Sequence, residues 1–84
     1  MQVLLYTTLG CHLCELAAGL AGPVCEQSGY ELIPVEIADS EGLIERYGVR
    51  IPVIAVSGYG PELGWPFDSG QLRAYLDEAA RTLK

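Results

Sequence analysis

Two cysteines separated by two residues, Cys11 and Cys14, are the feature that most constrains the fold of this chain. They follow an apolar run at residues 3–6 and open a stretch, residues 12–27, whose apolar positions recur near helical spacing. Two thiols at this spacing on the first turn of a helix can close a disulfide, and the helix N-terminus can hold one of them as a thiolate. The same spacing also occurs as half of a metal site. The pair therefore predicts a strand–turn–helix unit that carries redox or metal chemistry.

Length and composition indicate one small domain spanning residues 1–84. Half of the 84 residues are apolar, which is enough for a hydrophobic core and argues against disorder. The formal net charge of −6 argues against binding to nucleic acid or to an anionic membrane, because both require a cationic surface. The sequence has no apolar run of about 18 residues and no signal-peptide pattern, so we expect a cytoplasmic protein without a membrane span. In such a reducing compartment, three cysteines indicate redox or metal chemistry rather than a disulfide framework.

Hydrophobic periodicity and turn residues predict elements in the order βαβαββα. Strands are predicted at residues 2–6, 31–37, 52–56 and 61–65, and helices at residues 12–27, at residues 41–47 and after Asp68. A right-handed crossover makes the first two strands parallel, and the later hairpin adds antiparallel strands. We therefore expect an α/β fold with a mixed four-stranded sheet and helices on both faces. Asp68 and Gln71 match a capping box, whereas Pro23 clashes with the carbonyl of Gly19 and predicts a kink or break in the first helix.

Three segments resemble a known family: Cys-His-Leu-Cys at residues 11–14, Tyr-Gly-Val-Arg-Ile-Pro-Val at residues 47–53 and Trp-Pro-Phe-Asp at residues 65–68. With the strand before the cysteines and the helix after them, they are similar to a group of small bacterial glutaredoxin-like proteins. The resemblance covers nearly the whole chain and implies a thioredoxin-like fold of the glutaredoxin type. It also implies that Cys11 is the nucleophile, that Cys14 resolves the mixed disulfide, and that Pro52 is a cis-proline.

Four further residues are candidates for the site. His12, when protonated, would favour the Cys11 thiolate and tune its redox chemistry. The cis bond would hold Ile51 beside the dithiol, with its backbone N–H and C=O open to an extended substrate segment. Arg50 is a candidate to meet a carboxylate of the substrate. The resemblance implies that Asp68, besides capping a helix, helps to hold the amino end of glutathione.

The chain departs from typical dithiol glutaredoxins around the cysteines. Those proteins carry Cys-Pro-Tyr-Cys after a basic residue, whereas here the middle pair is His12-Leu13 and residues 6–10 carry no charge. Their Gly-Gly-x-x-Asp segment is replaced by Trp-Pro-Phe-Asp at residues 65–68. All of these departures concern the glutathione site, so glutathione is a candidate co-substrate rather than an assigned one.

The expected function is thiol–disulfide oxidoreduction, or electron transfer, through the Cys11–Cys14 dithiol. We expect a monomeric enzyme that reduces disulfide-containing or glutathionylated proteins, is itself reduced by glutathione or a reductase, and has no tightly bound cofactor and no bound metal. Two alternatives stay open: a module that carries an iron–sulfur cluster or a metal through Cys11, and a redox-inactive domain that recognises a partner. Cys25 lies about 16 Å along the helix from Cys14 and is expected to be a buried, inert thiol.

Overall fold

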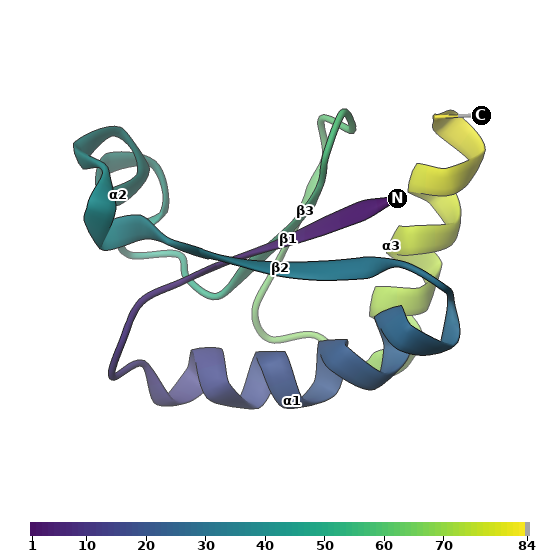
Figure 1. Ribbon diagram of the computed structural model, residues 1–84, viewed down its shortest axis with the longest axis horizontal. Coiled ribbons are helices and arrows are strands. Elements are labelled where there is room, and N and C mark those ends of the chain that lie inside the picture. Colours follow the sequence, from purple (N-terminus) through teal and green to yellow (C-terminus); the bar gives the residue numbers. More distant parts are fainter. Residues whose placement is uncertain (84) are drawn as a thin grey trace.

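A mixed four-stranded sheet forms the centre of the computed structural model, which describes residues 1–83. Its strands are β1 (Gln2–Thr7), β2 (Glu31–Glu36), β3 (Val53–Val56) and β4 (Glu62–Gly64). They lie in the order β2-β1-β3-β4 (Figure 1), with β1 parallel to β2 and antiparallel to β3, and with β3 antiparallel to β4. The predicted mixed sheet is confirmed. Because β1 is a central strand, the segment that follows it leaves the sheet with β2 on one side and β3 on the other.

Helices cover the two faces of this sheet. They are α1 (His12–Gln27), α2 (Glu41–Tyr47) and α3 (Ser69–Thr82), and a short 3₁₀ turn, η1 (Ile37–Asp39), precedes α2. The alternation of side chains along β1 separates the faces. Val3 and Leu5 pack into the main core with α1 and α3, whereas Tyr6 stacks on Tyr47 of α2 with 4.0 Å between ring centroids. Figure 1 shows α1 on one side of the strands and α2 on the other.

Side-chain caps define where α2 and α3 begin. The Leu43 N–H donates to Ser40 Oγ at 3.4 Å at the start of α2. At the start of α3, the Gln71 N–H donates to Asp68 Oδ1 at 2.7 Å and the Asp68 N–H donates to Gln71 Oε1 at 2.9 Å, which confirms the predicted capping box. The buried face of α3 consists of Leu72, Leu76 and Ala79. Each fully buried leucine contributes about 1.5–3 kcal/mol, so this face secures the helix against the sheet.

A kink or break was predicted at Pro23; α1 runs through this residue without interruption, so the helix does not break there. The helix is 16 residues long, and Pro23 lies in its second half with its ring exposed to solvent. Proline removes one backbone hydrogen bond, to the Gly19 carbonyl, and its ring crowds that carbonyl. Two residues of the helix face, Ala21 and Val24, are at most 3% exposed because they pack into the main core. Their burial stabilises the second half of α1 and offsets the lost hydrogen bond.

The loop after β1 and the segment before β3 lie at the same end of the sheet. β1 and β3 are antiparallel, and Tyr6 near the end of β1 pairs with Val53 at the start of β3. The loop after β1 therefore begins next to the Ile51–Pro52 segment that leads into β3, and the Ile51–Pro52 peptide bond is cis. No helix within residues 1–83 has both the length and the apolarity that crossing a membrane would require.

Candidate active site

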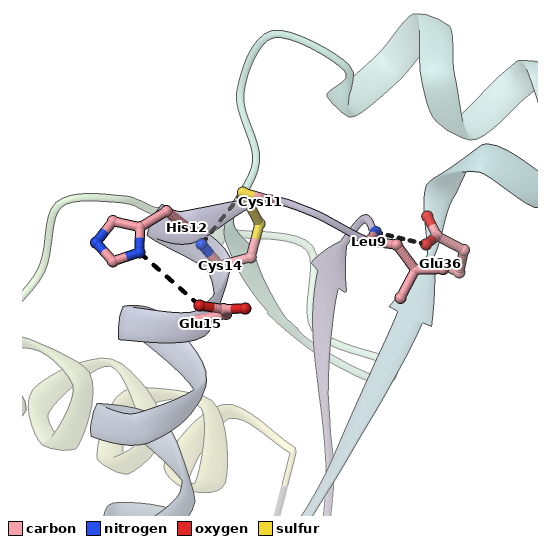
Figure 2. Close-up of a disulfide and its surroundings, with 6 residues drawn as sticks. All are labelled: Leu9, Cys11, His12, Cys14, Glu15 and Glu36. Carbon is pink, nitrogen blue, oxygen red and sulfur yellow. Dashed lines mark hydrogen bonds and ion pairs between the residues drawn. A yellow bond between two sulfur atoms is a disulfide. The ribbon is translucent and has the colours of Figure 1, made fainter.

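Cys11 and Cys14 form a disulfide at the N-terminus of α1 (Figure 2). Their Cα atoms are 5.2 Å apart, and Cys11 is the N-cap residue of the helix, whose Sγ accepts a hydrogen bond from the Cys14 N–H at 3.2 Å. Gly10 precedes the pair with φ of 79°, a conformation that favours glycine and lets the chain turn into the helix. Cys11 is partly exposed, whereas Cys14 is only 3% exposed. An external disulfide can thus reach the sulfur of Cys11, while Cys14 is accessible mainly from Cys11.

Glu36, at the end of β2, holds the turn that leads to Cys11. Its carboxylate accepts the Leu9 N–H at 2.9 Å and the Ala38 N–H at 3.0 Å, and the Cys11 N–H donates to the Thr8 carbonyl at 3.3 Å. The backbone N–H of Ala38, followed by the hydroxyl of Thr8, lowers the pKa of Glu36 below its ordinary value. Sequence reasoning missed this residue. The sequence places Glu36 at the end of a strand predicted to be parallel to β1. Because parallel neighbouring strands end at the same side of a sheet, this position could have indicated that Glu36 lies near the cysteine pair.

His12 lies on the first turn of α1, next to the nucleophile. Its side chain is 79% exposed, and its Nδ1 lies 3.8 Å from Oε2 of Glu15, which is an ion pair only when the imidazole is protonated. In Figure 2 the ring projects from the helix on the side away from Leu9. The structure thus places His12 beside Cys11 in the chain and links its ring to Glu15, and its redox-tuning role stays a prediction.

The Ile51–Pro52 segment is tied to its surroundings by backbone hydrogen bonds. The Ile51 N–H donates to the Tyr47 carbonyl at 3.0 Å, and the Pro52 carbonyl accepts the Trp65 N–H at 3.1 Å. The expectation that both backbone groups of Ile51 are open to a substrate is therefore wrong for the N–H, because that group already caps the end of α2. Pairing of the Ile51 carbonyl with an extended substrate stays a prediction.

Arg50 points to an internal carboxylate, that of Glu62. Its Nη2 lies 2.9 Å from Glu62 Oε1, Nη2 of Arg46 lies 3.7 Å from Oε2, and the Tyr47 hydroxyl donates to the same carboxylate. Burial opposes the ionisation of Glu62, but the hydrogen bonds from Tyr47 and Arg50 outweigh it and lower the pKa of this residue. Burial, reinforced by Glu62, raises the pKa of Tyr47. The cluster fixes the loop before Pro52, and the substrate contact expected of Arg50 stays a prediction.

Asp68 and Cys25 both contribute to the structure of the fold, one as a helix cap and the other in the core. Asp68 is the N-cap of α3, as described above, and its proposed contact with glutathione stays a prediction. Cys25 is 1% exposed in the main core, and burial raises the pKa of its thiol, which confirms that it is buried. Among residues 1–83 there is no group of three or more histidine, cysteine or acidic side chains placed to hold a metal ion.

Comparison with known proteins agrees with this geometry. The family described as Glutaredoxin-like domain (DUF836) matches residues 2–77. The search of curated proteins found no match. Among solved structures, the X-ray structure of the structural genomics target protein XcR50 from X. campestris is 38% identical, with 90% of this chain and 96% of that chain covered and a TM-score of 0.72. Its solution structure is 37% identical, with 93% and 95% covered and a TM-score of 0.77.

The fold also matches a more distant protein. Thioredoxin 1 from Thermosipho africanus TCF52B has a TM-score of 0.71 over 98% of this chain and 97% of that chain, at 7% identity. At this identity the likeness establishes the fold alone, which is the predicted thioredoxin-like α/β arrangement. This fold, with the Cys11–Cys14 pair at the start of α1, supports a redox role. By its match over residues 2–77, the chain belongs to the glutaredoxin-like domain family.

Proposed function

We propose that this protein is a thiol–disulfide oxidoreductase that reduces disulfides of proteins or mixed disulfides of glutathione. The observation that carries the proposal is the asymmetry of the cysteine pair. Cys11 is partly exposed at the N-terminus of a 16-residue helix, and Cys14 is 3% exposed beneath it. The free N–H groups and the dipole of that helix stabilise a thiolate at its N-cap, and such positions lower the thiol pKa from about 8.5 toward a range of about 3.5–7.5.

The reaction takes two exchanges. The Cys11 thiolate attacks one sulfur of the substrate disulfide, forms a mixed disulfide and releases the other sulfur as a thiolate, which takes up a proton. Cys14 then loses its proton and attacks Cys11, which releases the second substrate thiol and leaves the Cys11–Cys14 disulfide. The substrate disulfide is reduced and the protein dithiol is oxidised. Two molecules of glutathione, or a reductase, return the two electrons, and the reducing cytosol is the proposed setting.

Single replacements of the two cysteines test this mechanism. Cys11→Ser is expected to abolish the reduction of a peptide disulfide, because serine cannot form the mixed disulfide. Cys14→Ser is expected to retain the attack and to accumulate a mixed disulfide with the substrate, which mass spectrometry detects as an adduct at Cys11. Cys25→Ala serves as the control and should reduce the substrate normally. Full activity of the Cys11→Ser variant would contradict the mechanism.

A further inference from the structure

A groove of about 240 Å³ opens beside the disulfide, and both cysteines form part of its wall. It reaches across the end of β1 to Pro34 of the edge strand β2, so we call it the β2-side groove. Since β1 lies between β2 and β3, the groove and the Ile51–Pro52 segment flank the end of β1 on opposite sides. A substrate sulfur bonded to Cys11 would therefore have this groove on one side.

The walls of the β2-side groove are mostly apolar. Leu5, Leu9, Ala18 and Pro34 provide hydrocarbon surface, and Leu9 is 92% exposed although it is a large apolar side chain. Among the residues of the described chain that line the groove, Glu15 is the only one with a charge. An apolar channel with one carboxylate at its wall is complementary to a side chain that combines a long hydrocarbon stem with a cationic head.

Negative charge lies on both flanks of the disulfide (Figure 2). The Glu15 side chain is 77% exposed, and its Oε2 lies 3.8 Å from Nδ1 of His12, whose side chain is 79% exposed, so any charge pair between them is weak. On the other flank, the Glu36 carboxylate is held against the Leu9 N–H at 2.9 Å. The net charge of the whole chain has the same sign, at −6. These charges favour a cationic group in the groove and disfavour the carboxylates of glutathione.

We propose that the β2-side groove receives a lysine or arginine side chain of a peptide or protein disulfide, from a residue adjacent to the half-cystine that Cys11 attacks. The inference rests on the proposed oxidoreductase function and assigns its substrate class. The hydrocarbon stem lies against the apolar wall of the groove, and the cationic head reaches the exposed Glu15 carboxylate. The groove volume corresponds to about eight water molecules, which leaves room for one such side chain.

Two peptide disulfides of the same sequence test this assignment, one with lysine and one with glutamine beside the half-cystine. The pre-reduced protein is mixed with each peptide, and the single-turnover rate of reduction is measured. An exposed charge pair corresponds to an effect of about twofold to fivefold, so the lysine peptide is expected to react faster by that factor. Glu15→Gln should lower the ratio of the two rates toward one, because the charge pair at the groove is lost. Because both rates come from the same variant, any change in Cys11 reactivity cancels in the ratio.

Glu26→Gln is the matched control. It makes the same change of net charge on the same helix, at an exposed position near the far end of α1, and should keep the preference for lysine. Equal rates for the two peptides with the unmodified protein, or an unchanged ratio in Glu15→Gln, would overturn the assignment while leaving the proposed function intact. Failure to reduce either peptide would overturn both.

Discussion

A single carboxylate, that of Glu36, positions the turn that carries Cys11. Its oxygens accept N–H groups from Leu9 and Ala38, and so join the loop after β1 to the turn after β2. These bonds require an ionised acceptor to be at full strength, because charge-assisted hydrogen bonds are about twice as strong as neutral ones. At the residue scale, the geometry of the candidate site therefore depends on a residue that carries no chemistry of its own.

Replacing Glu36 with glutamine should destabilise the protein in a pH-dependent way. The pKa of Glu36 is lowered from its ordinary value of 4.5 in the folded protein, so its contribution to stability is present above that value. The contribution is lost as the pH falls through the folded pKa. The difference in free energy of unfolding between the unmodified protein and Glu36→Gln should therefore be largest at neutral pH and shrink below about pH 4.5.

Urea titrations of both proteins at several pH values measure this difference. Glu45→Gln, an exposed carboxylate on α2, carries the same change of net charge and serves as the control. A difference that stays constant from neutral to acidic pH would show that the Glu36 charge does not hold the turn.

At the scale of elements, caps and periodicity predicted most boundaries. The helices at residues 12–27 and 41–47 occupy the predicted ranges. Each begins directly after its N-cap residue, Cys11 or Ser40, and ends before its C-cap residue, Ser28 or Gly48. The last strand was predicted two residues too long, since β4 covers only Glu62–Gly64. The helix continues past Pro23, where a kink or break was predicted, because the packing of the buried helix face, which only the tertiary structure supplies, outweighs the local backbone chemistry.

For the candidate site, local features were predictable from the sequence and contacts between distant segments were not. Sequence reasoning located Cys11 at the start of a helix, because the pair lies between an apolar strand and a stretch with helical spacing; the structure adds that Cys11 is the N-cap. The β2-side groove combines residues of the loop after β1 with Pro34, and their proximity depends on the register of β1 and β2. Likewise, the bond from the Arg50 guanidinium to Glu62 depends on the pairing of β3 with β4. Contacts between distant segments were beyond what periodicity can show.

The proline in α1 offers a test of how this helix is stabilised. Pro23→Ala restores an N–H that can donate to the Gly19 carbonyl and removes the clash of the proline ring with that carbonyl. Together these changes stabilise the helix by about 3 kcal/mol. Alanine also raises the conformational entropy of the unfolded chain, and this lowers the gain in the free energy of unfolding by about 1 kcal/mol. The free energy of unfolding should therefore rise by about 2 kcal/mol in urea titrations.

Gly19→Ala provides the comparison on the same helix. A Cβ at this exposed position meets no neighbouring atom, so the variant should gain only the difference in helix propensity, about 1 kcal/mol. A Pro23→Ala variant that is no more stable than the unmodified protein would mean that α1 accommodates proline without cost.

At the scale of the whole molecule, the net charge is negative, and the Glu15 and Glu36 carboxylates beside the disulfide have the same sign. The net charge is −6, and within residues 1–83 three of the four arginines are paired with acidic side chains elsewhere: Arg46 and Arg50 with Glu62, and Arg81 with Glu78. The flanks of the disulfide instead carry Glu15 and Glu36. A substrate that approaches Cys11 therefore meets a negative potential, which acts at long range on the rate of encounter.

The dependence of the reduction rate on salt should reveal this potential. Between about 10 mM and about 1 M sodium chloride, the Debye length falls from about 30 Å to about 3 Å, so long-range attraction and repulsion are both screened. The rate with a cationic peptide disulfide should fall across this range, because attraction to the net negative protein is lost. The rate with glutathione disulfide, which is anionic at neutral pH, should rise, because repulsion is lost. An uncharged disulfide measured in parallel reports any effect of salt on the chemical step itself. If the cationic and anionic substrates changed in the same direction after this correction, the negative field of the molecule would have no part in selecting its substrates.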